Sequence, residues 1–176
     1  RLLWSMPVRR MEAEVVRDTV LAVSGMLDYQ MAGKPIPVMA DRTGQWVIGK
    51  ENLNAGRPGP VIEMEGQQYR RSLYVQVRRS RPLAVLEPFD LPELAPNCTQ
   101  RPSSTVPTQS LELLNSDFVT AQARFFAVRL TNRSQDIETQ VSEGWQLAFS
   151  KEISAEEKAE AIEFVTQMQA LLTKEY

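Results

Sequence analysis

Five arginines and one tyrosine form the densest group of side chains that could bind a ligand. They fall within twelve consecutive residues and are Arg70, Arg71, Tyr74, Arg78, Arg79 and Arg81. A guanidinium presents N–H donors in a planar fork that matches a carboxylate, a sulfate or a phosphate. One interpretation is therefore an arginine-rich surface that contacts an anionic polysaccharide or protein. The other interpretation, which we favour, is a set of ion pairs to acidic helices near the C-terminus, with the candidates Glu156, Glu157, Glu160 and Glu163.

Acidic side chains offer a second kind of chemistry. Glycoside hydrolysis needs two carboxylates roughly 5–9 Å apart and needs no histidine. The candidates form two groups, Glu63 and Glu65 in one and Glu87, Asp90 and Glu93 in the other. Either group could hold calcium, but neither has the spacing of an EF-hand. These residues are weak candidates for a carboxylate-based hydrolase, because such positions most often form a solvated face.

The chain contains no histidine and one cysteine, Cys98. It therefore lacks a Ser-His-Asp or Cys-His arrangement that would activate a nucleophile. It also lacks a CxxCH haem attachment site and a zinc site built on histidine or paired cysteines. Residues 44–50 fit the pattern GxxxxGK, but Glu51 stands where a phosphate-binding loop needs Ser or Thr. We expect a non-enzymatic role, no catalytic residue and no cofactor in this fragment, with Cys98 as a buried structural thiol.

The charge of the chain is unevenly distributed. The formal net charge is −2 over 176 residues; residues 1–101 carry 14 basic and 11 acidic side chains (+3), and residues 102–176 carry 6 and 11 (−5). Nucleic-acid-binding domains show a stronger basic excess, so we expect no nucleic-acid partner. No apolar run approaches the length of a membrane span. The length fits a single domain over residues 1–176, and the start at Arg1 predicts a fragment of a larger multidomain protein.

The first hundred residues alternate helical and extended patterns. Residues 10–27 predict a helix with the apolar stripe Val16, Val20, Val23 and Leu27. Residues 45–48 and 61–65 predict short strands. Residues 69–77 alternate polar side chains with Leu73, Val75 and Val77, which predicts a further strand. A turn at residues 66–68 would pair this strand with residues 61–65.

The last 70 residues predict four helices, near 107–114, 117–130 and 137–149 and from Ser154 onward. Thr105 is the expected N-cap of the first, and Ser154 with Glu157 fits a capping box for the last. The last helix has an apolar stripe that we expect to be buried, formed by Ala161, Val165, Met168 and Leu172 and widened by Ile162, Phe164 and Leu171. The predicted fold class is therefore mainly α (α+β). It has a helical, bundle-like C-terminal half, a small antiparallel β-element within residues 45–77 and long ordered loops.

Several strings of residues, in the same order, resemble a planctomycete family of unknown function, the PSD-type domain. They are residues 70–82, 86–90, 97–98 and 104–115, with further similarity at residues 1–4, 14–25 and 44–60. The resemblance implies a place at the C-terminal end of large planctomycete proteins, often after a cytochrome-c-like domain. Because the parent proteins tend to be exported, it also implies an extracytoplasmic location, in the periplasm or at the cell surface. It implies no catalytic residues.

These observations predict a non-catalytic interaction or scaffolding module of an exported protein. Its partners would be other domains of the parent protein and an anionic polysaccharide or protein. The alternative is a carboxylate-based hydrolase or an anionic polysaccharide-binding domain.

Overall fold

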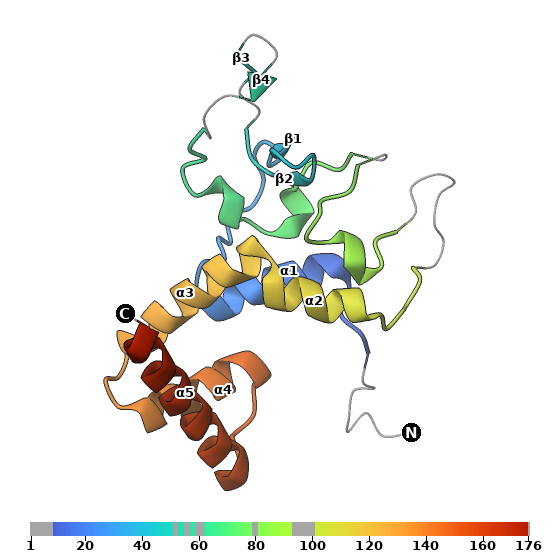
Figure 1. The fold of residues 1–176 in the computed structure, drawn as a ribbon. Helices are drawn as coiled ribbons and strands as arrows, with labels where there is room; N and C mark the ends of the chain where they lie inside the picture. The colour runs from blue at the N-terminus through green and yellow to red at the C-terminus, as the bar shows by residue number, and fades with distance from the viewer. Residues whose placement is uncertain are drawn as a thin grey trace, which may run out of the picture. The chain divides into compact units, whose positions relative to one another are not determined.

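The computed structural model describes residues 9–50, 53–54, 57–58, 62–78, 81–92 and 101–175. Within these ranges the protein is mainly α-helical with a small antiparallel β-element, which confirms the predicted fold class (Figure 1). The chain divides into two compact units. The first unit is Arg1–Ala22 with Met26–Gln122, and the second unit is Val23–Gly25 with Ala123–Tyr176. The assignment of residues 1–176 to a single domain stays a prediction beside this division.

Helix α1, Ala13–Ser24, buries a different face from the predicted one. Its buried side chains repeat every three or four residues and are Ala13, Arg17, Leu21 and Ser24. The predicted stripe, which begins at Val16 and Val20, is only half buried. The prediction was wrong because arginine is normally a surface residue, whereas the buried face of α1 is built around Arg17.

The β-element is a hairpin of β1, Val38–Ala40, and β2, Trp46–Ile48, in which Met39 lies opposite Val47. The strand predicted at residues 45–48 is therefore confirmed. In the connecting turn the Asp41 carboxylate accepts hydrogen bonds from the backbone N–H groups of Thr43 and Gln45. A second short pair consists of β3, Leu53–Asn54, and β4, Arg57–Pro58.

The strand predicted at residues 69–77 is wrong. Two short 3-10 turns occupy this segment, η1 at Gln67–Tyr69 and η2 at Ser72–Tyr74. Val75 is buried as expected, but Leu73 and Val77 are each 72% exposed. The hairpin with residues 61–65 is also not formed as predicted: Val61 lies outside the described residues, and Ile62 forms an isolated bridge to Lys50.

A side chain of α1 explains why β-forming residues adopt turns here. The Asp18 carboxylate accepts hydrogen bonds of 2.7 Å from both the backbone N–H and the hydroxyl group of Ser72. Side-chain bonds of this kind compete with the ladder of a sheet for the same backbone groups. Among the described residues, this segment forms single bridges, from Arg70 to Asp28 and from Val75 to Ile36.

The core of the first unit draws on α1, on the hairpin and on the loops that follow. Its buried apolar residues include Ile36, Val38, Trp46, Met64, Val75, Leu83, Leu86 and Phe89. Helix α2, Pro107–Asn115, contacts the 3-10 turn η3, Glu87–Phe89. Buried Gln109 fixes this contact, since its amide donates to the carbonyl oxygen of Pro88 and accepts from Arg10. Thr105 is not the N-cap of α2: that position is Val106, and the Thr105 hydroxyl oxygen accepts from Arg10 instead.

Three helices follow, and their predicted positions are confirmed: α3, Asp117–Thr131, α4, Ile137–Phe149, and α5, Ala155–Glu175. Helix α3 belongs to the first unit up to Gln122 and to the second from Ala123. The capping box of α5 is present, because Ser154 and Glu157 exchange hydrogen bonds at its first turn. Among the described helices, none has the length and apolar character needed to cross a membrane.

Candidate binding site

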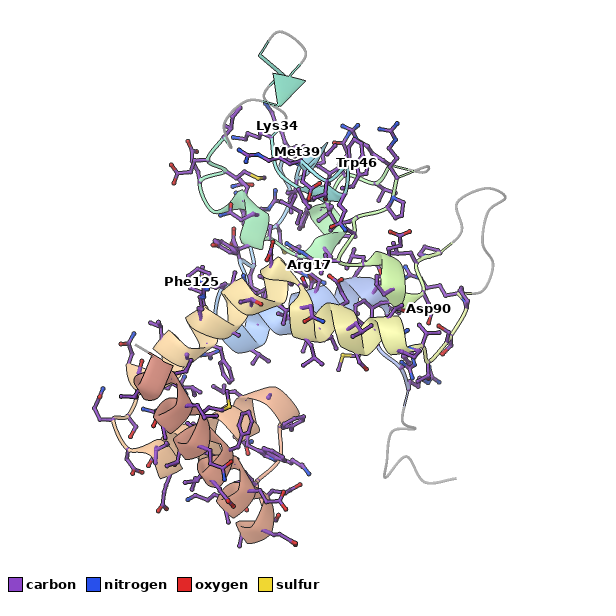
Figure 2. The ribbon with its side chains drawn as sticks, viewed as in Figure 1. Arg17, Lys34, Met39, Trp46, Asp90 and Phe125 are labelled. Atoms are coloured by element: carbon purple, nitrogen blue, oxygen red, sulfur yellow. The ribbon has the colours of Figure 1, made fainter. Side chains whose placement is uncertain are left out.

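Arg17 is a buried ionisable side chain of the first unit and is only 1% exposed. It projects from α1 (Figure 2). Its Nη1 donates to the carbonyl oxygen of Arg70 at 3.0 Å and to the Ser72 hydroxyl at 3.1 Å, and its Nη2 donates to the carbonyl oxygen of Gln68 at 2.6 Å. These bonds fasten α1 to the segment that contains η1 and η2.

One neighbouring carboxylate, that of Asp18, partly offsets the positive charge of Arg17. Burial lowers its pKa to about 10, and the Asp18 carboxylate, 3.6 Å from Nη1, opposes that shift. Arg17 therefore stays protonated at neutral pH. The Phe118 ring centroid lies 5.7 Å from its guanidinium carbon, within the range of a cation–π contact.

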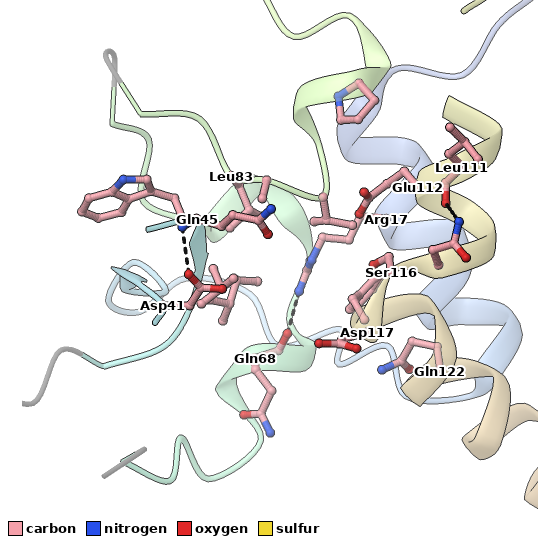
Figure 3. A pocket seen from close by; sticks show the side chains of 18 of the residues that line it. Arg17, Asp41, Gln45, Gln68, Leu83, Leu111, Glu112, Ser116, Asp117 and Gln122 are labelled. Carbon is pink, nitrogen blue, oxygen red and sulfur yellow. Dashed lines mark hydrogen bonds between the residues drawn. The ribbon is translucent and has the colours of Figure 1, made fainter. Parts of the chain in front are cut away.

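A cavity of about 870 Å³ opens beside Arg17 (Figure 3). Its wall combines β2, η1, the loop at Leu83–Val85, α2 and the first residues of α3. Apolar surface comes from Trp46, Leu83, Leu111 and Phe118. The volume falls in the range of small-molecule and peptide side-chain pockets.

Two buried polar atoms in residues of this wall have no hydrogen-bond partner among the described residues. They are Nε of Arg17, a donor, and Oε1 of Gln68, an acceptor. A buried polar group without a partner costs roughly 1–3 kcal/mol of stability. A hydrogen bond from a bound molecule to either atom would therefore contribute a favourable free energy.

Three carboxylates line the same cavity: Asp41, Glu112 and Asp117. The hydroxyl of Thr43, together with the backbone N–H groups of Gln45 and Thr43, holds the pKa of Asp41 below its ordinary value. Among the described residues, no lysine or arginine forms an ion pair with any of the three. The charged residues of the cavity wall are thus three carboxylates and one arginine, a net charge of −2.

Arg70 is one of the predicted anion-binding residues, but its observed contacts are with groups inside the protein. It is 1% exposed, and its Nη1 donates to the carbonyl oxygen of Lys34 at 3.0 Å. Its Nη2 donates to the carbonyl oxygen of Ala32, and its guanidinium lies 4.2 Å from the centroid of the Tyr74 ring. Arg70 and Tyr74 together hold the loop at residues 32–34.

The other predicted arginines lie nearer to solvent. Arg71 is 4.0 Å from the Asp18 carboxylate. Arg78 and Arg81 both stack on the Trp46 ring, at 4.3 and 5.3 Å from its centroid. Arg79 lies outside the described residues. The contacts of the four described arginines are with neighbours inside the first unit, so they give no support to the predicted ion pairs with the glutamates of α5. Their role in binding an anion stays a prediction.

Four of the predicted carboxylates, Glu63, Glu65, Glu87 and Asp90, do not line the cavity around Arg17. Glu63, Glu65 and Glu87 are exposed, and Glu93 lies outside the described residues. Asp90 accepts hydrogen bonds of 2.7 Å from the hydroxyl and the N–H of Ser104, which lower its pKa. Asp90, labelled in Figure 2, therefore ties the residue after η3 to Ser104, shortly before α2. In the described part of the chain no group of three or more His, Cys, Asp or Glu residues could hold a metal ion.

The residues that form the cavity were not predicted as a site. Glu112 and Asp117 lie on helices whose positions were correct, but nothing in their spacing links them to Asp41. Arg17 carried a usable signal, since it occupies the position between Ala13 and Leu21 on one helical face. An arginine in that position needs several acceptors from elsewhere in the chain, and only the folded structure identifies them.

Comparisons with known proteins give one result. A family model described as PSD1, protein of unknown function (DUF1553), matches residues 1–165. The comparison with curated proteins and the comparison with solved structures found no match. The match confirms the family resemblance seen in the sequence.

Proposed function

The chain belongs to the PSD1 family of proteins of unknown function (DUF1553), and from this starting point we propose that it is a non-catalytic interaction module. Its cavity holds a short segment of a partner polypeptide. The observation that carries the proposal is the unpartnered Nε of Arg17 in the wall of that cavity.

A polypeptide supplies both groups that the wall lacks. Each residue other than proline has one carbonyl acceptor and one N–H donor. A carbonyl oxygen of the bound segment meets Nε of Arg17, and an N–H group meets Oε1 of Gln68. The apolar wall at Trp46, Leu83 and Phe118 then covers a neighbouring aliphatic side chain, which contributes burial of apolar surface.

The charge of the wall selects a basic segment. Asp41, Glu112 and Asp117 carry three negative charges without ion-pair partners among the described residues. A lysine or arginine of the bound segment compensates them, whereas an acidic side chain is repelled. This assignment differs from the anionic partner predicted for the arginine-rich surface, which concerns Arg71, Arg78 and Arg81 and not the cavity.

A binding role fits the carboxylates better than catalysis. A general acid or base works best with a pKa near the working pH, but hydrogen bonds lower the pKa of Asp41. The carboxylates considered for a hydrolase, such as Glu63 and Glu65, do not line the cavity. The segment bound there belongs to another domain of the exported parent protein, the setting that the family resemblance implies.

Blocked pentapeptides test this proposal. The probes are acetyl-Gly-Leu-Lys-Leu-Gly-amide and the same peptide with glutamate in place of lysine, measured by calorimetry at low salt. The lysine peptide binds at least about tenfold more tightly, and the double variant Glu112→Gln, Asp117→Asn removes that preference. The matched control is Glu63→Gln, an exposed carboxylate away from the cavity, which leaves the preference unchanged. Equal binding of both peptides by the wild-type chain contradicts the proposal.

A further inference from the structure

Helix α5 of the second unit has one broad apolar side, and among the described residues only part of it is half buried. Ala161, Ile162 and Val165 are half buried, in keeping with the contact between α4 and α5. The rest of this apolar side is exposed and consists of Phe164 (63%), Met168 (40%), Leu171 (56%) and Leu172 (55%). The sequence predicted these four residues as core, and that prediction is wrong for the chain by itself.

The four exposed side chains form a continuous row. Their spacing of four, three and one residues places them on one side of the helix. A single exposed leucine is ordinary, but a contiguous row of large apolar side chains marks an interaction surface. We call Phe164, Met168, Leu171 and Leu172 the α5 row.

A line of acidic residues runs beside the α5 row. Glu156, Glu160 and Glu163 repeat with a spacing of four and three residues, so they too share one side of the helix. At about 100° per residue, this line lies roughly 80° around the helix from Phe164, Met168 and Leu171. The acidic line therefore borders the row along one edge.

These three glutamates differ from three further acidic residues of the second unit, which do form ion pairs. Glu138, Glu143 and Glu157 each form an ion pair, with Lys158, Arg133 and Lys151 respectively. No ion pair involves Glu156, Glu160 or Glu163 among the described residues. Glu163 accepts a hydrogen bond of 2.9 Å from the neutral amide of Gln167, which leaves the negative charges of the three glutamates uncompensated within the described residues.

We propose that α5 docks an amphipathic helix of a partner protein, with basic residues along one flank. The apolar ridge of that helix covers the α5 row, and its lysines or arginines face Glu156, Glu160 and Glu163. This is the arrangement in which flanking charges choose the partner of a helical seam. The site lies wholly within the second unit and is independent of the cavity around Arg17.

Charge argues against two other occupants. Helix α5 contains five glutamates and two lysines, a net charge of −3, so a second copy of α5 brings like charges together. A membrane surface attracts amphipathic helices that are rich in lysine and arginine on their polar face, and α5 has the opposite charge.

Two designed peptides of 18 residues test the proposal. Both have a leucine ridge with helical spacing; one carries lysines along the flank and the other carries glutamates at the same positions. Fluorescence anisotropy with the whole chain at low salt gives a roughly tenfold or larger preference for the lysine peptide. The triple variant Glu156→Lys, Glu160→Lys, Glu163→Lys reverses the preference, and its helix content by circular dichroism shows that it is folded.

The apolar part of the site is tested separately. Phe164→Ser with Leu171→Ser abolishes binding of the lysine peptide, while Leu114→Ser, at a residue that is 77% exposed on α2, does not. Equal binding of the two peptides by the wild-type chain overturns the proposal. So does a wild-type dimer in sedimentation equilibrium that Phe164→Ser with Leu171→Ser converts to a monomer, because the second copy is then the occupant.

Discussion

Arg17 and Arg70, each only 1% exposed, are joined directly, since Nη1 of Arg17 donates a 3.0 Å hydrogen bond to the carbonyl oxygen of Arg70. One buried arginine thus holds the backbone of another, 53 residues further along the chain. Arg70 in turn holds the loop at residues 32–34 through the carbonyl oxygens of Ala32 and Lys34. The first unit is organised by this relay of guanidinium–carbonyl bonds as well as by its apolar core.

Replacing Arg17 tests the relay. Arg17→Ala leaves the carbonyl oxygens of Gln68 and Arg70 without their donor, and we expect it to lower the free energy of unfolding by roughly 2–4 kcal/mol. Arg17→Lys keeps the charge but loses the planar fork of N–H donors. We therefore expect its free energy of unfolding to lie between those of the wild type and Arg17→Ala. Urea unfolding followed by circular dichroism measures the change. The control is Arg71→Ala, near the same Asp18 but largely exposed, for which we expect less than about 1 kcal/mol; equal losses for Arg17 and Arg71 contradict the relay.

The bond between Asp90 and Ser104 makes stability depend on pH. Hydrogen bonds from the Ser104 hydroxyl and N–H lower the pKa of Asp90 in the folded state. Its contribution is therefore fully present above the unfolded pKa, near 3.8, and is lost as pH falls through the lower folded value. We expect the difference in unfolding free energy between wild type and Asp90→Asn to be constant at neutral pH and to shrink below about pH 4. A difference that stays constant down to pH 2 would show that the Asp90 carboxylate is not held in this way; Glu63→Gln serves as the reference.

Gly144 is a point of close approach between α3 and α4. A Cβ at this position would lie 3.2 Å from Cδ1 of Leu130, and Gly144 is buried. Gly144→Val adds two further methyl groups, and we expect a loss of roughly 1–3 kcal/mol in thermal or urea unfolding. Ala148→Val, an exposed site on the same helix, changes only helix propensity, by less than about 1 kcal/mol. Similar losses for the two variants speak against tight packing at Gly144.

Trp46 reports on the arginines that stack on it. Arg78 and Arg81 lie over its ring, and each contact is worth roughly 0.5–1 kcal/mol at a partly exposed site. We expect Arg81→Ala to lower stability by no more than about 1 kcal/mol and to change the fluorescence of the protein. The variant Leu73→Ala, at an exposed residue, is the control. Unchanged fluorescence in Arg81→Ala is the result that the stacking does not allow.

The helices were predictable because their signals are local. The apolar spacing that predicts α4 lies within residues 137–149 themselves. The start of α5 is marked within four residues, by Ser154 and Glu157. The segment that contains Leu73, Val75 and Val77 could not be predicted in the same way. Its β-forming residues adopt turns because Asp18, 54 residues earlier, binds the backbone and hydroxyl of Ser72.

The candidate site was hidden for the same reason. Asp41, Glu112 and Asp117 come from three separate elements, and their shared cavity depends on how a turn, α2 and α3 pack. The dense arginines drew attention to Arg70, but the fold buries that side chain and leaves Arg17, an arginine outside the dense group, in the cavity wall. Sequence patterns found the helices, whereas long-range packing decided which charges are free.

The most direct test of the account follows the Nε–H group of Arg17 by NMR during addition of acetyl-Gly-Leu-Lys-Leu-Gly-amide. Arg17→Lys identifies the signal by its loss. The account predicts that the signal shifts progressively and saturates with the lysine peptide. The glutamate peptide should need an at least about tenfold higher concentration to produce half of that shift. An Nε–H signal that does not move while the peptide binds elsewhere on the chain would contradict the assignment of the cavity as the binding site.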